Sequence, residues 1–272
     1  MNNHQNRHIE QISSFRNPKI KNFATLQKSR ERKKQNLFIV EGLKEIEKAG
    51  LKGYNFKSVF YTKDLISERD LFQMPGMNQP ECRFYEVSKD IFASIAYRES
   101  SGGVVVCAEP RAHGLDTLDL KADPLVLVLE SVEKPGNLGA VLRTADAAGL
   151  DAVIVCDTQT DVYNPNVVRS SLGCSFTVPL IVAESEEVID YLNQKQVGIY
   201  CTALTASKPY HTIDYSKGAA IVMGTEATGL TNKWLDNSSQ NIIIPMKGVV
   251  DSMNVSTSAA IVIFEALRQR GF

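Results

Sequence analysis

Short apolar runs alternate with helical segments along the C-terminal part of the chain. The runs are almost continuous in apolar residues, which is typical of strands buried on both faces of a sheet. They predict strands at residues 125–129, 152–156, 176–180, 198–204, 219–223 and 241–244. Helices are predicted at residues 138–148, 165–172, 186–195 and 255–270. This alternation predicts an α/β fold, in which a parallel sheet carries helices on both faces and ligands bind at the carboxyl ends of the strands.

The N-terminal part of the chain repeats this alternation on a smaller scale. Strands are predicted at residues 37–40, 57–61, 83–87 and 104–109, and helices at residues 41–49 and 89–97. These elements predict a small α/β domain that ends near residue 109. Residues 110–123 are polar and contain Pro and Gly, as linkers do. We therefore expect two domains, at residues 1–109 and 124–272, joined by a linker.

The charge of the chain is distributed unevenly. The 272 residues have a net charge of −1, but residues 1–36 hold nine Lys or Arg residues and two acidic residues, so this basic arm has a net charge of +7. A basic arm on an acidic body is typical of proteins that bind a polyanion such as nucleic acid. A solvated, partly disordered terminus would have the same composition, so charge alone leaves both interpretations open.

The rest of the composition excludes several classes of protein. A content of 43% hydrophobic residues argues against a disordered chain. The five cysteines form no CxxC pair and no cluster with histidine, so we expect buried, reduced thiols and no zinc site. No apolar run reaches the length of a membrane span, and the N-terminus lacks the apolar core of a signal peptide. We therefore expect a cytoplasmic protein without metal or membrane segment.

Two loops that follow predicted strands carry candidate chemistry. In residues 130–145, Asn137 can cap the start of a helix, and Arg143 lies between one and two turns further along it. A capped helix with a surface arginine would show the same spacing. Residues 222–231 approach the pattern of a P-loop, but Leu230 stands where the lysine should be, and Glu226 would repel phosphates. The second loop is therefore not predicted to bind a nucleoside triphosphate.

A third loop, residues 244–257, links the last predicted strand to the last predicted helix. Ser252, Asn254 and Ser256 place short polar side chains near the start of that helix. The helix itself is apolar on most of its faces, so it has to be buried. We expect it to lie partly in the core and partly against a second subunit.

Together the three loops resemble the SpoU/TrmH branch of the SPOUT methyltransferases, which methylate ribose 2′-hydroxyls of RNA. Three motifs of that family occur in its order and spacing: Asn-x-Gly-x-x-x-Arg, Gly-x-Glu-x-x-Gly-Leu and Ile-Pro-Met-x-Gly followed by Ser-Leu-Asn-Val-Ser. The matching residues are Asn137, Gly139, Arg143, Gly224, Glu226, Gly229, Leu230, Ile244, Pro245, Met246, Gly248, Ser252, Asn254, Val255 and Ser256. Met253 replaces the usual Leu, which conserves volume. The resemblance covers residues 124–272, and residues 16–109 resemble the family's N-terminal substrate-binding domain less specifically.

The resemblance implies a C-terminal trefoil knot that binds S-adenosylmethionine. The family holds this cofactor in the second and third loops. This implies contacts from Gly224, Ile244 and Met253. Apolar walls would come from Ile244 and Met246, with Leu204 adding to them.

The resemblance also implies catalytic roles. The arginine of the first motif, here Arg143, is proposed in this family to accept the 2′-hydroxyl proton. Because a guanidinium stays protonated and has no acceptor lone pair, we expect Arg143 to bind the neighbouring phosphate and the developing alkoxide instead. Glu226 would orient Arg143 through a charge-assisted hydrogen bond, and Asn137 would hold Arg143 or the ribose. Ser252 and Asn254 would complete the ribose pocket.

The partners implied are RNA and a second copy of the chain. The family forms homodimers through the knot, in which Arg143 can act in its own subunit or across the dimer. The basic arm and the N-terminal domain would hold RNA through phosphate contacts, and the N-terminal domain favours ribosomal RNA over transfer RNA. Two alternatives on the same fold are a non-catalytic RNA-binding factor and an enzyme that methylates a base.

Overall fold

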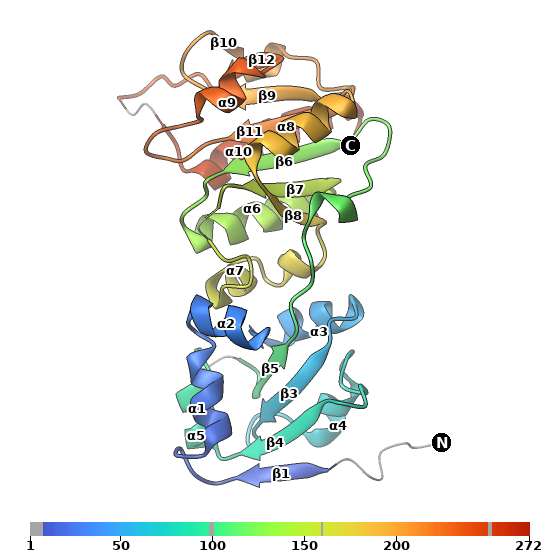
Figure 1. The fold of residues 1–272 in the computed structure, drawn as a ribbon, viewed down its shortest axis with the longest axis vertical. Helices are drawn as coiled ribbons and strands as arrows, with labels where there is room; N and C mark the ends of the chain where they lie inside the picture. The colour runs from blue at the N-terminus through green and yellow to red at the C-terminus, as the bar shows by residue number, and fades with distance from the viewer. Residues whose placement is uncertain (1–7, 98–100, 159, 250–251) are drawn as a thin grey trace. The chain divides into compact units, whose positions relative to one another are not determined.

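The computed structural model describes residues 8–97, 101–158, 160–249 and 252–272. Its contacts divide the chain into two compact units (Figure 1). The first comprises Met1–Arg111 and Val162–Thr177, and the second comprises Ala112–Asp161 and Val178–Phe272. The sequence pattern grouped residues 162–177 with the C-terminal domain, whereas these residues pack with the first unit.

The first unit is built on a five-stranded mixed sheet of order β1-β4-β3-β5-β2. Its strands are β1 (Ile9–Ile12), β2 (Phe38–Glu41), β3 (Phe56–Tyr61), β4 (Arg83–Val87) and β5 (Val104–Ala108). Its helices are α1 (Pro18–Thr25), α2 (Ser29–Gln35), α3 (Leu43–Leu51), α4 (Glu68–Gln73), α5 (Lys89–Ile95), α7 (Pro165–Ser170) and the 3-10 helix η2 (Cys174–Phe176). The first unit thus combines helices and strands around one sheet.

From residue 8 onward, the basic arm is part of this fold. It forms β1, α1 and α2, and its Phe23 and Leu26 are fully buried. Arg32 is buried as well, and its guanidinium donates to the carbonyl oxygens of Leu26 and Gln27, at 2.8 Å each. The interpretation of a partly disordered terminus is therefore wrong for the described residues, while residues 1–7 lie outside them.

The second unit is built on a seven-stranded sheet of order β10-β12-β9-β11-β6-β7-β8, in which every pairing is parallel. Its strands are β6 (Leu125–Glu130), β7 (Ala152–Cys156), β8 (Leu180–Ala183), β9 (Gly198–Thr202), β10 (Ser207–Pro209), β11 (Ala219–Met223) and β12 (Gln240–Ile243). Its helices are η1 (Leu115–Thr117), α6 (Pro135–Ala148), α8 (Ser185–Gln194), η3 (Tyr210–Thr212), α9 (Asn232–Asp236) and α10 (Val255–Arg270). The parallel α/β architecture is thus confirmed.

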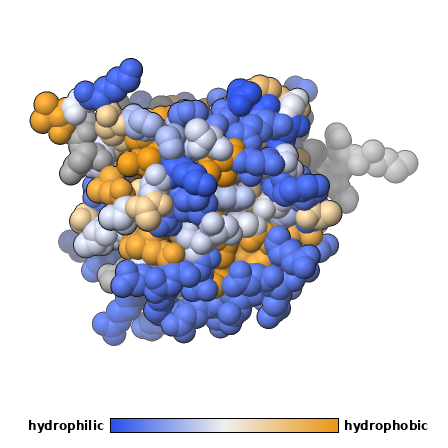
Figure 2. Space-filling model, turned by 90° about the horizontal axis from the view of Figure 1, so that it is seen from above, coloured by the Kyte–Doolittle hydropathy of each residue, from blue (hydrophilic) through white to orange (hydrophobic). Residues whose placement is uncertain are grey.

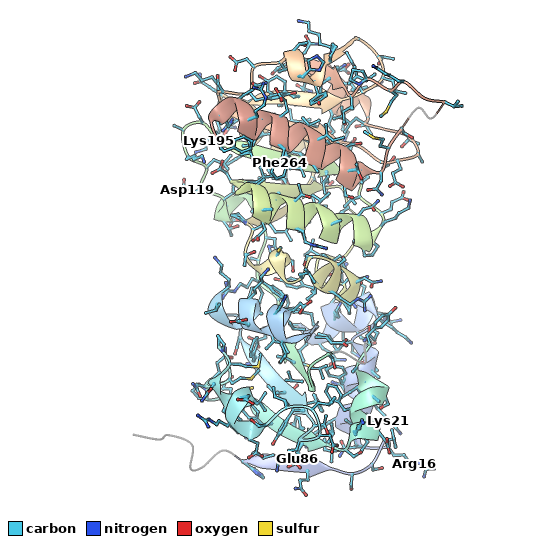
Figure 3. All side chains as sticks on the ribbon, turned by 180° about the vertical axis from the view of Figure 1, so that it is seen from behind. Arg16, Lys21, Glu86, Asp119, Lys195 and Phe264 are labelled. Carbon is cyan, nitrogen blue, oxygen red and sulfur yellow. The ribbon has the colours of Figure 1, made fainter. Side chains whose placement is uncertain are left out.

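Helices cover both faces of this sheet. Val188 and Leu192 of α8 and Trp234 of α9 pack in one cluster with Val126 and Val128 of β6, which point to the same face because side chains alternate along a strand. On the other face, α6 and α10 pack against each other and contact β7 and β11 (Figure 3). Strands buried on both sides account for the continuous apolar runs in the sequence.

One predicted strand is wrong. Residues 176–180 were expected to form a strand, but Phe176 ends η2 and β8 begins only at Leu180. The ring of Phe176 packs against the ring of Tyr54 in the first unit, with centroids 4.8 Å apart. An apolar run records burial but does not show which unit buries it.

Candidate functional site

The strand order places a natural crevice beside β6. The chain runs from β6 to β7 on one side of β6, whereas β11 pairs with its other side. At such a reversal of strand order the connecting loops diverge and leave room at the carboxyl ends of the strands. A cavity of about 290 Å³, called cavity 2, lies there, between Leu129 and Glu130 of β6 and Met223 and Gly224 at the end of β11.

Three loops that are distant in sequence meet at cavity 2 through their side chains. The Asn137 amide donates to Glu226 Oε1 at 2.8 Å. The Asn254 amide donates to the same oxygen at 3.2 Å and to Asn137 Oδ1 at 3.1 Å. Lys134 forms an ion pair with the Glu226 carboxylate. We call these four residues the polar cluster.

Local structure explains why these side chains can meet. Asn254 is the N-cap of α10, and its Oδ1 accepts from the Ser256 backbone N–H at 3.0 Å, as an N-cap residue does. Its amide nitrogen therefore points outward, toward Asn137. Asn137 lies in the first turn of α6, which Pro135 opens at its first position. Both helices present their N-terminal ends to the loop that carries Glu226.

Glu226 is the charged centre of the polar cluster. The Lys134 ammonium and then the Asn137 amide, both hydrogen-bonded to the carboxylate, hold the pKa of Glu226 below its ordinary value. The side chain of Glu226 is 31% exposed, so its charge remains accessible from the cavities. Glu226 therefore stays ionised at neutral pH, with the Lys134 ammonium as its counter-charge.

A larger cavity of about 460 Å³, called cavity 1, adjoins the polar cluster through Glu226 and Ala227. It lies beside the ends of β9 and β12 and the loop after β11. Four of its apolar lining residues are Leu204, Ile244, Met246 and Met253, and its polar rim includes Ser252. Figure 2 looks onto the end of the second unit where β10 and β12 lie, and there hydrophobic residues form small groups between hydrophilic ones.

Cavity 1 suits a molecule that combines a flat apolar part with a cation. Its volume lies within the roughly 300–1,000 Å³ range of small-molecule sites. Apolar walls match an aromatic ring, and the Glu226 carboxylate at the rim matches a positive charge. Among the residues that the structure describes, no group of three or more His, Cys, Asp or Glu side chains could hold a metal ion.

Arg143 is placed differently from the other predicted residues. It is exposed on α6 and lines neither cavity. The expected hydrogen bond from Arg143 to Glu226 is absent from the described chain, because Glu226 accepts from Lys134, Asn137 and Asn254 instead. Arg143 lies six positions after Asn137, which places it about 120° away around a helix of 3.6 residues per turn.

The other predicted site residues collect around the two cavities. Leu204, Ile244, Met246, Ser252 and Met253 line cavity 1. Asn137 and Gly224 line cavity 2, and Glu226 lines both. Asn254 joins them through its hydrogen bonds.

Sequence reasoning missed Lys134. It stands directly before Pro135 and three residues before Asn137, inside the first loop, so its position in a candidate loop was the signal. Charge complementarity with Glu226, 92 residues further along the chain, could not be read from spacing.

Two further observations concern the chain as a whole. The five cysteines are all buried, and no disulfide joins them. In the described ranges, no helix has both the length and the apolar character that crossing a membrane requires.

Comparison with known proteins identifies relatives of both units. Residues 124–264 match the SpoU rRNA Methylase family, and residues 17–106 match the MRM3-like substrate binding domain. The first match covers the segment that supplies both cavities and the polar cluster.

Individual relatives match along most of the chain. The chain is 32% identical over 257 residues to the 23S rRNA (guanosine(2553)-2′-O)-methyltransferase RlmP of Bacillus subtilis (strain 168), covering 94% of this chain and 98% of that protein. It is 37% identical over 212 residues to the 23S rRNA (guanosine-2′-O-)-methyltransferase RlmB of Bordetella pertussis (strain Tohama I), covering 75% of this chain and 86% of that protein. The crystal structure of an AdoMet-bound rRNA methyltransferase from Sinorhizobium meliloti is 30% identical, with a TM-score of 0.87 over 96% of this chain and 98% of that one.

Proposed function

The chain belongs to the SpoU rRNA methylase family, and on that premise we propose that it methylates a ribose 2′-hydroxyl of ribosomal RNA with S-adenosylmethionine as the methyl donor. The relatives named above are ribosomal RNA methyltransferases. The observation that carries the proposal is the convergence of Asn137, Glu226 and Asn254, one from each motif, in a hydrogen-bonded cluster beside cavity 1.

Cavity 1 is the proposed cofactor site. Ile244, Met246, Met253 and Leu204 would enclose the adenine ring, since burial of apolar surface favours binding. Gly224 is the first residue of the loop that separates the two cavities, and it lines cavity 2. When bound, S-adenosylmethionine supplies a methyl group on a positively charged sulfur, which is already activated for transfer.

The polar cluster is proposed to hold the ribose. Asn137 and Asn254 carry amide groups that can bind sugar hydroxyls, and Ser252 adds a hydroxyl at the rim of cavity 1. Fixing the ribose next to the cofactor replaces a bimolecular encounter by an oriented one. Because the partners of Glu226 keep its carboxylate ionised, it would serve to orient donors and not to deliver a proton.

Arg143 is proposed to act across a homodimer. It is exposed, and within the described chain it makes no hydrogen bond or ion pair, so its guanidinium is available to a second copy. There it would bind the phosphate next to the target ribose and stabilise the alkoxide that forms as the 2′-hydroxyl loses its proton. The proton would leave to a phosphate oxygen or to water, since a guanidinium cannot accept it.

The proposed dimer uses the outer face of α10. Phe264 is 43% exposed there (Figure 3), and Ile261 and Leu267 are half-buried. A trefoil knot in the C-terminal segment is part of the same proposal. It is supported by the contact of the loop after β11 with the N-cap of α10, through Glu226 and Asn254.

Reaction with purified RNA tests the proposed function. The full chain, incubated with S-adenosylmethionine and unmodified ribosomal RNA, is expected to yield a 2′-O-methylated nucleoside, detected by mass spectrometry after digestion. Unmodified transfer RNA, treated in parallel, is expected to yield little of the 2′-O-methylated nucleoside. A base-methylated product, modification of transfer RNA alone, or no product with protein that binds both RNA and cofactor would each contradict the proposal.

A further inference from the structure

A buried carboxylate lies at the carboxyl end of β6, outside the roles assigned above. Glu130 is only 2% exposed. Its Oε2 accepts from the backbone N–H of Thr231 at 2.8 Å, and its Oε1 accepts from the Thr231 hydroxyl at 2.6 Å. Both carboxyl oxygens thus bond to one residue, and together the two hydrogen bonds link two segments 101 residues apart.

Thr231 is the residue at which the loop between the two cavities ends. Residues 224–230 form a narrow loop, closed by hydrogen bonds from Thr225 N–H to Gly229 O at 3.2 Å and from Gly229 N–H to Thr225 O at 3.1 Å. Thr225, Glu226 and Ala227 of this loop line both cavities. The shape of the loop therefore sets one wall of each.

The two ends of this loop are held in different ways. At its start, Met223 belongs to β11, which pairs with β6 along its whole length. At its end, Thr231 precedes α9 as the N-cap, but its side chain makes no capping hydrogen bond and donates to Glu130 instead. A threonine at an N-cap usually accepts from the helix backbone. Here the side chain serves the loop and not the helix.

We propose that Glu130 is a positioning residue that fixes the end of loop 224–230 on β6 and thereby holds the wall of cavity 1 in its cofactor-binding shape. This inference rests on the proposed function, because it takes S-adenosylmethionine as the occupant of cavity 1. Glu130 does not line cavity 1, so it acts on the cofactor only through the loop. Without the link, the loop keeps its attachment to β11 but its far end is free to shift.

The test measures cofactor affinity and loop mobility separately. Calorimetry gives the Kd of S-adenosylmethionine for the purified full chain without RNA, and hydrogen exchange gives the protection of amides in residues 225–230. The variants are Glu130→Ala, which removes both acceptors, and Glu130→Gln, whose amide oxygen can accept from the Thr231 N–H while its NH₂ donates to the hydroxyl. Thr231→Val removes only the hydroxyl bond and serves if Glu130→Ala does not fold.

Asp151 provides a matched control. Its Oδ2 accepts from the backbone N–H of Leu125 at 2.8 Å, at the opposite end of β6 from Glu130. Asp151→Ala therefore also removes a carboxylate that accepts a backbone hydrogen bond at β6, but far from the loop. It is expected to lower the melting temperature while leaving the Kd of S-adenosylmethionine unchanged.

Glu130→Ala is expected to raise the Kd at least tenfold, equivalent to about 1.4 kcal/mol, and to speed exchange in residues 225–230 more than in β7. Glu130→Gln is expected to stay within about threefold of wild type, and Thr231→Val to fall between the two. The inference is overturned if Glu130→Ala keeps the Kd and the exchange rates of the wild type. If Glu130→Ala does not fold, the same result for Thr231→Val overturns it. An equal rise in Kd for Asp151→Ala would overturn it as well. If the wild-type chain itself fails to bind S-adenosylmethionine, it is the proposed function that fails.

Discussion

At the scale of single residues, the polar cluster shows how one carboxylate connects three motifs. Glu226 accepts from Asn137 and Asn254 and pairs with Lys134. Asn137 and Asn254 are also bonded to each other. Removing Glu226 would therefore leave two amides and an ammonium without their shared acceptor.

The ionisation of Glu226 makes the contribution of the polar cluster to the free energy of unfolding depend on pH. Lys134, and then Asn137, hold its pKa below the ordinary value, so the carboxylate stabilises the fold above the pKa of about 4.3 that the unfolded chain has. That stabilisation is lost as the pH falls through the lower folded-state pKa. We expect the stability difference between wild type and Glu226→Gln to be constant above about pH 5 and to shrink below about pH 4. Urea denaturation between pH 7 and pH 3 measures it, and a difference that grows on acidification would contradict the assignment.

Substitution of Arg143 should lower turnover and leave the stability of the fold almost unchanged. It is exposed and without a hydrogen bond in the described chain, so Arg143→Ala is expected to change the unfolding free energy by less than about 0.5 kcal/mol. Loss of a donor that stabilises developing charge lowers kcat by roughly 100- to 1,000-fold. Single-turnover kinetics measures the loss of turnover, and calorimetry of S-adenosylmethionine binding shows whether a loss of cofactor affinity contributes to it. Lys217→Ala, another exposed cation of the same unit, is the control, and full turnover by Arg143→Ala would refute the role.

The sequence predicted this site unevenly, for a physical reason. Motif spacing identified Asn137, Glu226 and Asn254, which the structure brings together. Their hydrogen bonds were not predictable, because helix phase and loop path decide which side chains face each other. Glu226 therefore contacts Lys134 and not Arg143.

At the scale of elements, the loop after β11 depends on a close approach between the backbone at its start and the backbone near its end. A Cβ added to Gly224 would lie 2.2 Å from the carbonyl carbon of Gly229, which no real contact permits. Gly224→Ala is therefore expected to open the loop and raise the Kd of S-adenosylmethionine more than tenfold, while the rest of the sheet stays folded. Calorimetry and circular dichroism test this. Gly136→Ala, in open space, should bind as wild type does, and equal Kd values for both variants would contradict the prediction.

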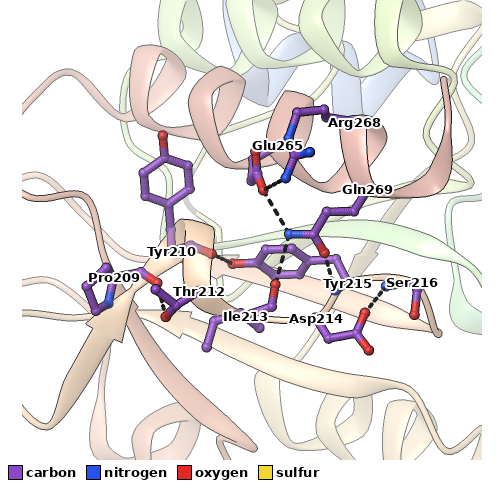
Figure 4. Close-up of polar contacts among 10 residues, drawn as sticks. All are labelled: Pro209, Tyr210, Thr212, Ile213, Asp214, Tyr215, Ser216, Glu265, Arg268 and Gln269. Carbon is purple, nitrogen blue, oxygen red and sulfur yellow. Dashed lines mark hydrogen bonds and ion pairs between the residues drawn. The ribbon is translucent and has the colours of Figure 1, made fainter.

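The C-terminal end of α10 is fastened to the segment before β11 (Figure 4). Gln269 Oε1 accepts from the Tyr215 N–H at 2.8 Å, and its Nε2 donates to Ile213 O at 2.9 Å and to Glu265 Oε1 at 2.8 Å. Gln269→Ala leaves the Tyr215 N–H and the Ile213 carbonyl without this partner, which costs about 1–3 kcal/mol, whereas Glu265 keeps its hydrogen bonds from Arg268. Urea denaturation is expected to show that loss, whereas Arg268→Ala, which removes an exposed guanidinium, is expected to lose much less stability. Equal losses would mean that Gln269 does not fasten the helix.

Helices and strands were predictable where the spacing of apolar residues along the sequence matched the residues that are buried in the structure. The helix at residues 255–270 is confirmed to the residue, because its N-cap Asn254 and the closing Gly271 are both visible in the sequence. The helices of the basic arm were missed, since their many charged residues hide the few that are buried, such as Ile20 and Phe23. The short β10, with a Pro in its three residues, gives almost no pattern.

At the scale of the whole molecule, the basic arm becomes a folded surface with a defined set of free charges. Lys19 pairs with Glu10, and Arg32 is buried on backbone carbonyls. Six other cations of the arm are exposed: Arg16, Lys21, Lys28, Arg30, Lys33 and Lys34. Deleting the arm would remove Phe23 and Leu26 from the core, so a truncation would confuse loss of RNA contacts with loss of folding.

Charge substitution on α2 avoids that confusion and tests where RNA binds. Lys33 and Lys34 are exposed in its last turn, and Ala is a good helix former there. We expect the double variant Lys33→Ala, Lys34→Ala to weaken RNA binding and to lower the slope of log K against log salt by about 1 to 2, since each phosphate contact contributes roughly 0.7–0.9.

The matched control is Lys195→Ala with Lys217→Ala, which removes the same charge from exposed positions of the second unit. Fluorescence anisotropy with a ribosomal RNA fragment, at several salt concentrations, measures both double variants. Because a general loss of positive charge would lower the slope equally in both, only a larger effect on α2 supports a phosphate-binding surface in the first unit. Equal slopes would place the RNA elsewhere, and leave the +7 charge of residues 1–36 as a property of solubility alone.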